Sequence, residues 1–192
     1  MLEILLIRPG CTQFDEDGRI KGALDIPLSS RGVAQARALA ISLQHVKLDF
    51  LYIADSESAV QTAKEIAEHN FCRQRILPRL TNLDHGLWQG KLLSEVKRLQ
   101  PRVYRQFQER PSEVCPPGGE MVLTAVDRVQ DEIQKLVRHH PNGRVGVLVP
   151  EPLASIVRFT VQGGSLGDLW KSELDFGTVE RLLASDSRLQ PV

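Results

Sequence analysis

The stretch that decides the fold is "LLIRPGCTQF", residues 5–14. It continues an apolar run, Leu2–Ile7, whose lack of polar alternation indicates a strand buried on both faces of a sheet. The strand ends at Arg8, Pro9 and Gly10. An arginine and a glycine at the end of a buried strand are typical of an anion pocket, but proline has no side chain that can act as a nucleophile. The stretch therefore predicts an anion-binding loop that has no nucleophilic side chain at Pro9, between the arginine and the glycine.

The rest of the chain alternates strands and helices in the manner of a parallel α/β protein. The expected elements are helices over about 30–43, 57–67, 92–109, 122–137 and 153–161, strands over 50–54, 75–77 and 145–149, and a closing antiparallel hairpin over 172–185. We expect a three-layer α/β sandwich, with a mostly parallel sheet and helices on both faces. One domain spans 1–192, with a helical excursion at about 84–118.

The composition excludes several classes of function. The chain has 192 residues, with 24 basic and 24 acidic side chains, so no nucleic-acid-binding footprint is visible. Its apolar runs have the length of strands, and its first residues lack a basic leader, so we expect a soluble, cytoplasmic protein without a membrane partner. The three cysteines lack the paired spacing of a disulfide framework or a zinc site. No metal and no cofactor are expected.

Five strings, in order, carry a resemblance to a known family. They are "LLIRPGCT", "GRIKGALDIPLSSRGVAQA", "AVQTAKEIAE", "DHGLWQGK" and "CPPGGE". In order and spacing they resemble the histidine phosphatase superfamily, in its phosphoglycerate mutase-like branch, over nearly the whole chain. The resemblance implies a phosphoglycerate mutase-like fold, with a pocket at the carboxyl ends of the strands.

The resemblance also implies that the catalytic residues are replaced. The family uses a histidine nucleophile in an arginine-lined pocket, a carboxylic acid that protonates the leaving oxygen, and a second histidine. Carried over by position, the nucleophile falls on Pro9 and the acid on Asn82. The second histidine falls on Glu151, and the second pocket arginine on Ser58. These four are the degenerate positions. An asparagine of the family pattern becomes Asp15. No catalytic residue is therefore expected at these positions.

Few groups remain that could hold an anion. The candidates are Arg8, Gly10, Thr12 and Arg19, and the expected pocket-lining residues are Cys11, Asp15, His85 and Glu151. The two acids would make the pocket repel a phosphate. A competing interpretation is that Arg8 forms an internal ion pair with Glu151 or Asp15. We favour that pair, because an unpaired buried guanidinium is costly.

These residues predict a catalytically inactive pseudoenzyme, a scaffold that binds or regulates another protein. Two alternatives stay open. One is a phosphohydrolase or phosphomutase with a relocated active centre, which uses Cys11 or a metal held by Asp15 and Glu151. The other is a non-catalytic binder that holds a small anionic ligand through Arg8. The sequence does not set the oligomeric state.

Overall fold

The computed structural model describes residues 1–172 and 176–184, and among them five strands form one sheet. Its strand order is β3 (Arg73–Leu77), β2 (Phe50–Ala54), β4 (Gly143–Leu148), β1 (Leu2–Ile7) and β5 (Val179–Ala184). The first four strands are parallel, and β5 is antiparallel to β1. The predicted fold class is confirmed: the sheet is mixed and mostly parallel.

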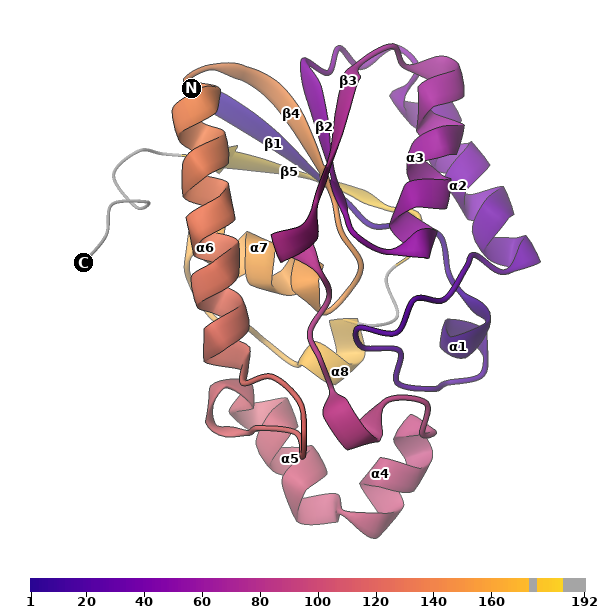
Figure 1. Ribbon diagram of the computed structural model, residues 1–192, viewed down its shortest axis with the longest axis vertical. Coiled ribbons are helices and arrows are strands. Elements are labelled where there is room, and N and C mark those ends of the chain that lie inside the picture. Colours follow the sequence, from indigo (N-terminus) through magenta and orange to yellow (C-terminus); the bar gives the residue numbers. More distant parts are fainter. Residues whose placement is uncertain (173–175, 185–192) are drawn as a thin grey trace.

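Helices cover both faces of this sheet. They are α1 (Gln13–Glu16), α2 (Ser30–Leu43), α3 (Glu57–His69), α4 (Leu93–Leu99), α5 (Pro101–Glu109), α6 (Val122–His139), α7 (Leu153–Gln162) and α8 (Leu169–Ser172), with 3-10 turns at Pro78–Leu80, Gly86–Trp88 and Pro111–Glu113. Figure 1 shows α2 and α3 on one side of the sheet and α6 and α7 on the other, with α4 and α5 beyond its lower end. The helical excursion expected at about 84–118 contains α4 and α5.

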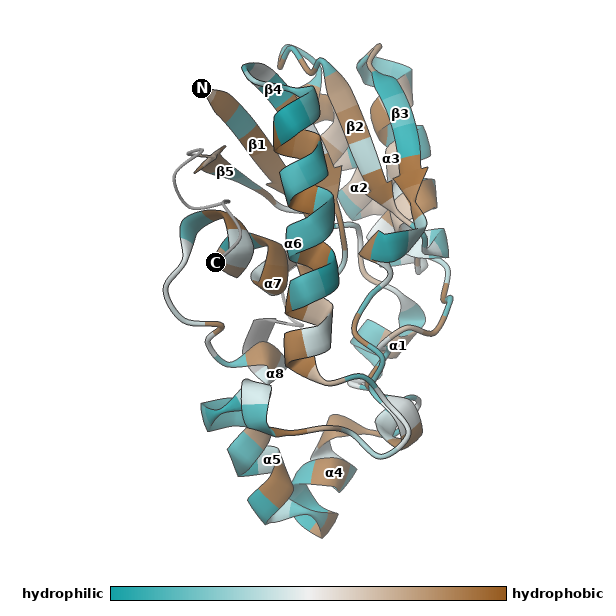
Figure 2. Cartoon of the chain, turned by 60° about the vertical axis from the view of Figure 1, so that its left-hand side comes forward, coloured by the Kyte–Doolittle hydropathy of each residue, from teal (hydrophilic) through white to brown (hydrophobic). Residues whose placement is uncertain are grey.

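Apolar spacing explains why α6 packs on the sheet. Its buried residues recur every three or four positions, as in Val122, Val126, Val129 and Ile133, so they form one stripe on a helix of 3.6 residues per turn. Figure 2 shows this helix with its polar side outward and the strands behind it largely apolar. The stripe and the strands therefore share one core.

An aromatic cluster attaches the excursion to the sheet. Trp170 lies 4.5 Å from Phe107 and 5.7 Å from Tyr104, centroid to centroid, and Trp88 lies 5.9 Å from Phe107. The ring of His85 is fully buried and stacks on Trp170 at 5.5 Å. The structure therefore corrects the expectation that His85 lines the mouth of the site, because it lies inside this cluster under α5.

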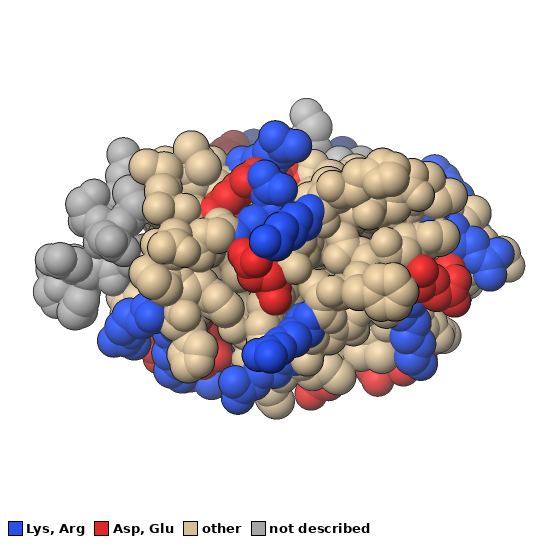
Figure 3. Space-filling view, turned by 90° about the horizontal axis from the view of Figure 1, so that it is seen from above, with Lys and Arg blue, Asp and Glu red and all other residues tan. Residues whose placement is uncertain are grey.

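Charges of both signs are mixed over the surface. Seen from above, basic and acidic side chains lie next to one another in a band across the face (Figure 3). Arg144 and Glu3, for example, form a 2.7 Å ion pair between the N-terminal ends of β4 and β1. In the described part of the chain, none of the helices has the length and hydropathy needed to cross a bilayer.

A half-buried histidine, His140, should make stability fall in mild acid. The ring Nε2 of His140 lies 2.7 Å from the hydroxyl of Tyr52, and burial, reinforced by the neighbouring His139, lowers the pKa of His140 below 6.5. The unfolded chain then binds more protons as the pH falls through that range, so the folded state loses stability. Between pH 7.5 and 5.5, urea unfolding should show a larger loss for the wild type than for His140→Gln. The exposed His45→Gln control should keep the wild-type slope, and an unchanged slope in His140→Gln would contradict the assignment.

Candidate active site

The candidate site lies at the carboxyl ends of three parallel strands. Arg8 follows β1, Ser58 lies in the first turn of α3 just after β2, and Glu151 follows β4. The ends of parallel strands meet at one edge of the sheet, where open α/β sheets place their ligands. Residues as far apart in the sequence as Arg8 and Glu151, which are 143 positions apart, therefore meet at one place.

A buried ion pair occupies the end of β1. The Nε atom of Arg8 lies 2.6 Å from Oε1 of Glu151, and the two side chains are 4% and 2% exposed. Nη2 of Arg8 lies 3.3 Å from the half-buried Glu180, and Oε2 of Glu151 accepts a 3.0 Å hydrogen bond from the amide of Ser155. Burial alone would lower the pKa of Arg8, but the attraction and hydrogen bonds of Glu151 and Glu180 outweigh it and raise that pKa. The expected internal pair is present.

A second carboxylate has its own cation. Both carboxylate oxygens of Asp15 lie 3.0 Å from the ammonium of Lys21, and Oδ2 also accepts hydrogen bonds from the amide and the hydroxyl of Thr12. Lys21 is nearly buried. Sequence reasoning missed Lys21, although it stands inside the quoted string "GRIKGALDIPL". Each acid of the site is therefore neutralised by a buried cation.

The other anion-binding candidates are engaged in local structure. The amide of Gly10 donates to the hydroxyl of Thr62 over 3.2 Å, and Thr12 caps α1. Arg19 donates to the carbonyl of Gly90 over 2.8 Å. Of the two charged candidates, Arg8 and Arg19, it is Arg8 whose guanidinium lies beside Glu151 at the ends of the strands.

The side chain of Asn82 forms hydrogen bonds that connect its own loop to the loop at Gly22 and to the segment 151–153. Its amide nitrogen donates to the carbonyls of Gly22 and Glu151 over 3.0 and 2.9 Å, and its oxygen accepts from the amide of Leu153 over 3.2 Å. The amide thus joins the loop that carries Lys21 to the loop that carries Glu151. It has no proton to donate as a general acid.

Among the described residues, the structure does not support either of the two relocated centres considered from the sequence. Cys11 is buried, and its Sγ lies 3.4 Å from the hydroxyl of Ser29 and 3.6 Å from the carboxylate of Glu16. Burial is the largest cause that raises the pKa of its thiol, which disfavours a thiolate nucleophile. Within the described residues, no three His, Cys, Asp or Glu side chains gather as a metal site. Asp15 and Glu151 face cations instead.

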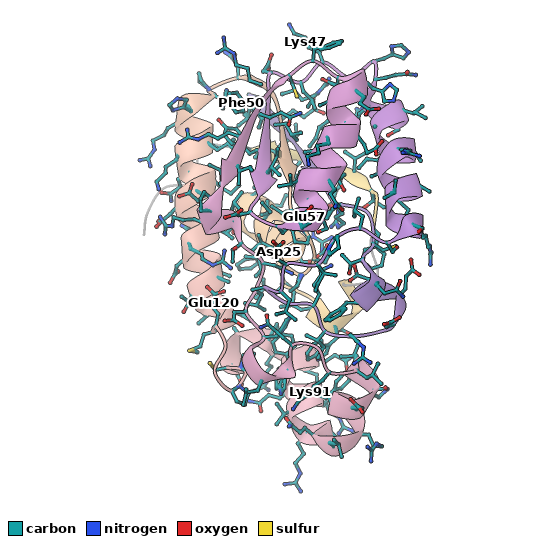
Figure 4. All side chains as sticks on the ribbon, turned by 45° about the vertical axis from the view of Figure 1, so that its right-hand side comes forward. Asp25, Lys47, Phe50, Glu57, Lys91 and Glu120 are labelled. Atoms are coloured by element: carbon teal, nitrogen blue, oxygen red, sulfur yellow. The ribbon has the colours of Figure 1, made fainter. Side chains whose placement is uncertain are left out.

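A small pocket lies among described residues at the ends of the strands. Its volume is about 10 Å³, room for about one water molecule. Lys21, Ser58 and Asn82 line it. Next in the chain to the lining residues Leu24 and Ser56, the amide of Glu57 donates to the carboxylate of Asp25, and Figure 4 shows these two residues next to each other. A phosphate ester would reach the guanidinium of Arg8 only if its buried pair with Glu151 opened.

Comparison with known proteins now places the chain. The model of the histidine phosphatase superfamily (branch 1) matches residues 4–191. The chain belongs to this superfamily. It is 30% identical over 175 residues to phosphoserine phosphatase 1 of Hydrogenobacter thermophilus. This match covers 91% of this chain and 83% of that protein. It is 29% identical over 177 residues to a metal-independent phosphoserine phosphatase of Arabidopsis thaliana, covering 90% and 74%.

Solved structures show the same fold. Bacillus stearothermophilus YhfR superposes with a TM-score of 0.84 at 23% identity, covering 97% of this chain and 93% of that one. The alpha-ribazole phosphatase from Shigella flexneri superposes with a TM-score of 0.78 at 22% identity, covering 99% and 98%. The phosphoglycerate mutase-like architecture expected from the sequence is confirmed.

These relatives correct the functional prediction. The expectation of an inactive pseudoenzyme that serves as a scaffold is wrong on this finding, because the two relatives described above are named as phosphatases. The electrostatic reason behind that expectation also fails in part. It counted Asp15 and Glu151 as excess negative charge, whereas Lys21 and Arg8 neutralise them in the structure.

Proposed function

We propose that the chain is a phosphohydrolase for small phosphate monoesters, with an active centre formed by Arg8 and Glu151 at the ends of β1 and β4. The reaction class is supported by the relatives named as phosphoserine phosphatases. The observation that carries the assignment of residues is the buried guanidinium–carboxylate pair at the ends of β1 and β4. It puts a phosphate-binding group and a candidate base 2.6 Å apart.

The proposed step is a direct displacement by water, because Pro9 cannot accept a phosphoryl group. The phosphate takes the place of Glu151 on the guanidinium of Arg8, which binds phosphate as readily as carboxylate. The released carboxylate removes a proton from a water molecule. The water oxygen bonds to phosphorus as the bond to the ester oxygen breaks. The proton returns through solvent to the leaving alkoxide, so the products are an alcohol and inorganic phosphate.

Two neighbouring groups fit supporting roles. The ammonium of Lys21 lines the pocket and can stabilise charge on the leaving oxygen. Asn82 holds the carbonyl of Glu151 and so fixes the loop from which the carboxylate swings. The relative named metal-independent supports a reaction that persists in a chelator.

The test is a hydrolysis assay with O-phosphoserine and p-nitrophenyl phosphate, with and without EDTA. Turnover should persist in EDTA, and Arg8→Gln should lose it. Glu151→Gln should lower kcat by about 10² or more, the usual contribution of a general base. If Glu151 only blocked the pocket, Glu151→Gln would instead raise kcat.

The matched control is Glu65→Gln, which removes an exposed carboxylate paired with Arg37 at 3.2 Å and should leave kcat unchanged. Thermal unfolding of each variant separates loss of chemistry from loss of fold. No turnover of either ester by the folded wild type would contradict the proposal. Anion binding without turnover would favour the alternative that the chain binds a small anion without catalysis. That alternative, a protein partner and a cytoplasmic location all stay predictions.

A further inference from the structure

A second pocket lies on the outer side of the excursion. It has a volume of about 530 Å³, within the range typical of small-molecule sites. It is lined by Pro101, Arg102, Arg105, Gln106, Glu109, Arg110 and Glu113. None of these residues lines the pocket at the ends of the strands. The outer pocket is therefore a separate feature of α5 and the turn that follows it.

The sequence of α5 places its arginines on this outer side. Phe107 is buried, and Val103 and Tyr104 pack partly against the core, so these residues fix the inner face of the helix. Arg102 and Arg105 are three positions apart, which puts them side by side on the helix surface. Prolines at the starts of α5 and of the following turn set the two ends of this segment.

The arginines that line the outer pocket differ in whether they form an ion pair. Neither Arg102 nor Arg105 forms an ion pair with any residue that the structure describes, whereas Arg110 and Glu113 pair at 3.6 Å. Gln106 and Glu109 add hydrogen-bonding groups beside the two arginines. The pocket therefore offers two guanidinium groups to an anion, and acceptors to donors on the same ligand.

We infer that this pocket binds a sugar phosphate. The phosphate lies between Arg102 and Arg105, because guanidinium forks bind phosphate oxygens in bidentate fashion. The hydroxyl groups donate to Glu109, whose carboxylate only accepts hydrogen bonds, and to the amide oxygen of Gln106. A lone phosphate would leave most of the 530 Å³ unfilled and would forgo these acceptors. The site is independent of the proposed active centre.

The test is calorimetric titration with glucose 6-phosphate in 0.15 M salt, where exposed charges are screened over about 8 Å. The double variant Arg102→Gln/Arg105→Gln should bind at least 10-fold more weakly than the wild type. Arg98→Gln, which removes an exposed arginine on α4 outside the pocket, should bind as the wild type does. Glu109→Gln should weaken binding of glucose 6-phosphate but not of inorganic phosphate.

Arg8→Gln separates this site from the proposed active centre. Binding to the outer pocket should survive Arg8→Gln, even if all hydrolysis is lost. Equal affinity in the wild type and in the Arg102→Gln/Arg105→Gln variant would overturn the inference, as would loss of binding in Arg8→Gln or the absence of binding at millimolar ligand. Thermal unfolding should show that the excursion variants keep their fold, since all four substituted arginine and glutamate positions of the excursion are exposed. Arg8→Gln removes a buried group, so its binding is measured below the unfolding temperature of that variant.

Discussion

Replacing Arg8 by leucine is expected to lower the free energy of unfolding by about 4 kcal/mol, because removal of one partner leaves a buried charge unpaired. The carboxylate of Glu151 is 2% exposed and would keep one protein hydrogen bond, from the amide of Ser155. Urea denaturation of the wild type and the variant measures the difference. Arg37→Leu serves as the control, because its 3.2 Å pair with Glu65 is 66% and 20% exposed on the two sides and should be worth less than about 1 kcal/mol.

The double variant Arg8→Leu/Glu151→Leu should recover most of this loss. A buried ion pair is often replaced by apolar side chains at little cost, because the desolvation of both charges disappears with them. The two single variants should therefore be strongly non-additive in a double-mutant cycle. Additive losses would contradict the pairing, and a loss below 1 kcal/mol in Arg8→Leu would show that the pair is exposed to water in solution.

The fold could be predicted from the sequence because local patterns and global topology agree. The run Leu2–Ile7 became the buried strand β1, and the stripe from Val122 to Val137 became the buried face of α6. The closing hairpin expected over 172–185 can be compared with the structure only in part. Val179–Ala184 is one strand, antiparallel to β1, and residues 173–175 and 185 lie outside the described residues. A strand's pairing partner depends on contacts that are distant in sequence, which periodicity does not report.

The site was predicted in part, for a similar reason. The pairing of Arg8 with Glu151 could be expected, because family spacing puts both residues at the ends of neighbouring strands. The partner of Asp15 could not, since Lys21 stands in a loop whose path no periodicity fixes. Burial also reversed an expectation: His85, next to Gly86 in a polar loop, lies in an aromatic cluster. Charge balance in a pocket is therefore poorly judged from matched positions alone.

Replacing Gly32 by alanine should destabilise the protein by about 3 kcal/mol, although the same change inside an ordinary helix stabilises by about 0.5–1 kcal/mol. Gly32 lies in the first turn of α2, where the helix touches the loop after β1. An added Cβ would come within 1.9 Å of the carbonyl oxygen of Cys11. That oxygen is backbone and already accepts a 3.0 Å hydrogen bond from the amide of Ser29, so it cannot move aside cheaply.

The same contact links stability to the site. A Cβ at Gly10 would come within 2.1 Å of the carbonyl oxygen of Gly32, so the two glycines let the loop and the helix touch from both sides. The loop displaced by Gly32→Ala carries Arg8, so the variant should lose phosphate-ester hydrolysis together with stability. Gly18→Ala is the control: its φ of +68° is strained but its surroundings are open, so it should cost about 1 kcal/mol and leave hydrolysis intact. A stabilised Gly32→Ala would show that the loop and α2 are farther apart in solution.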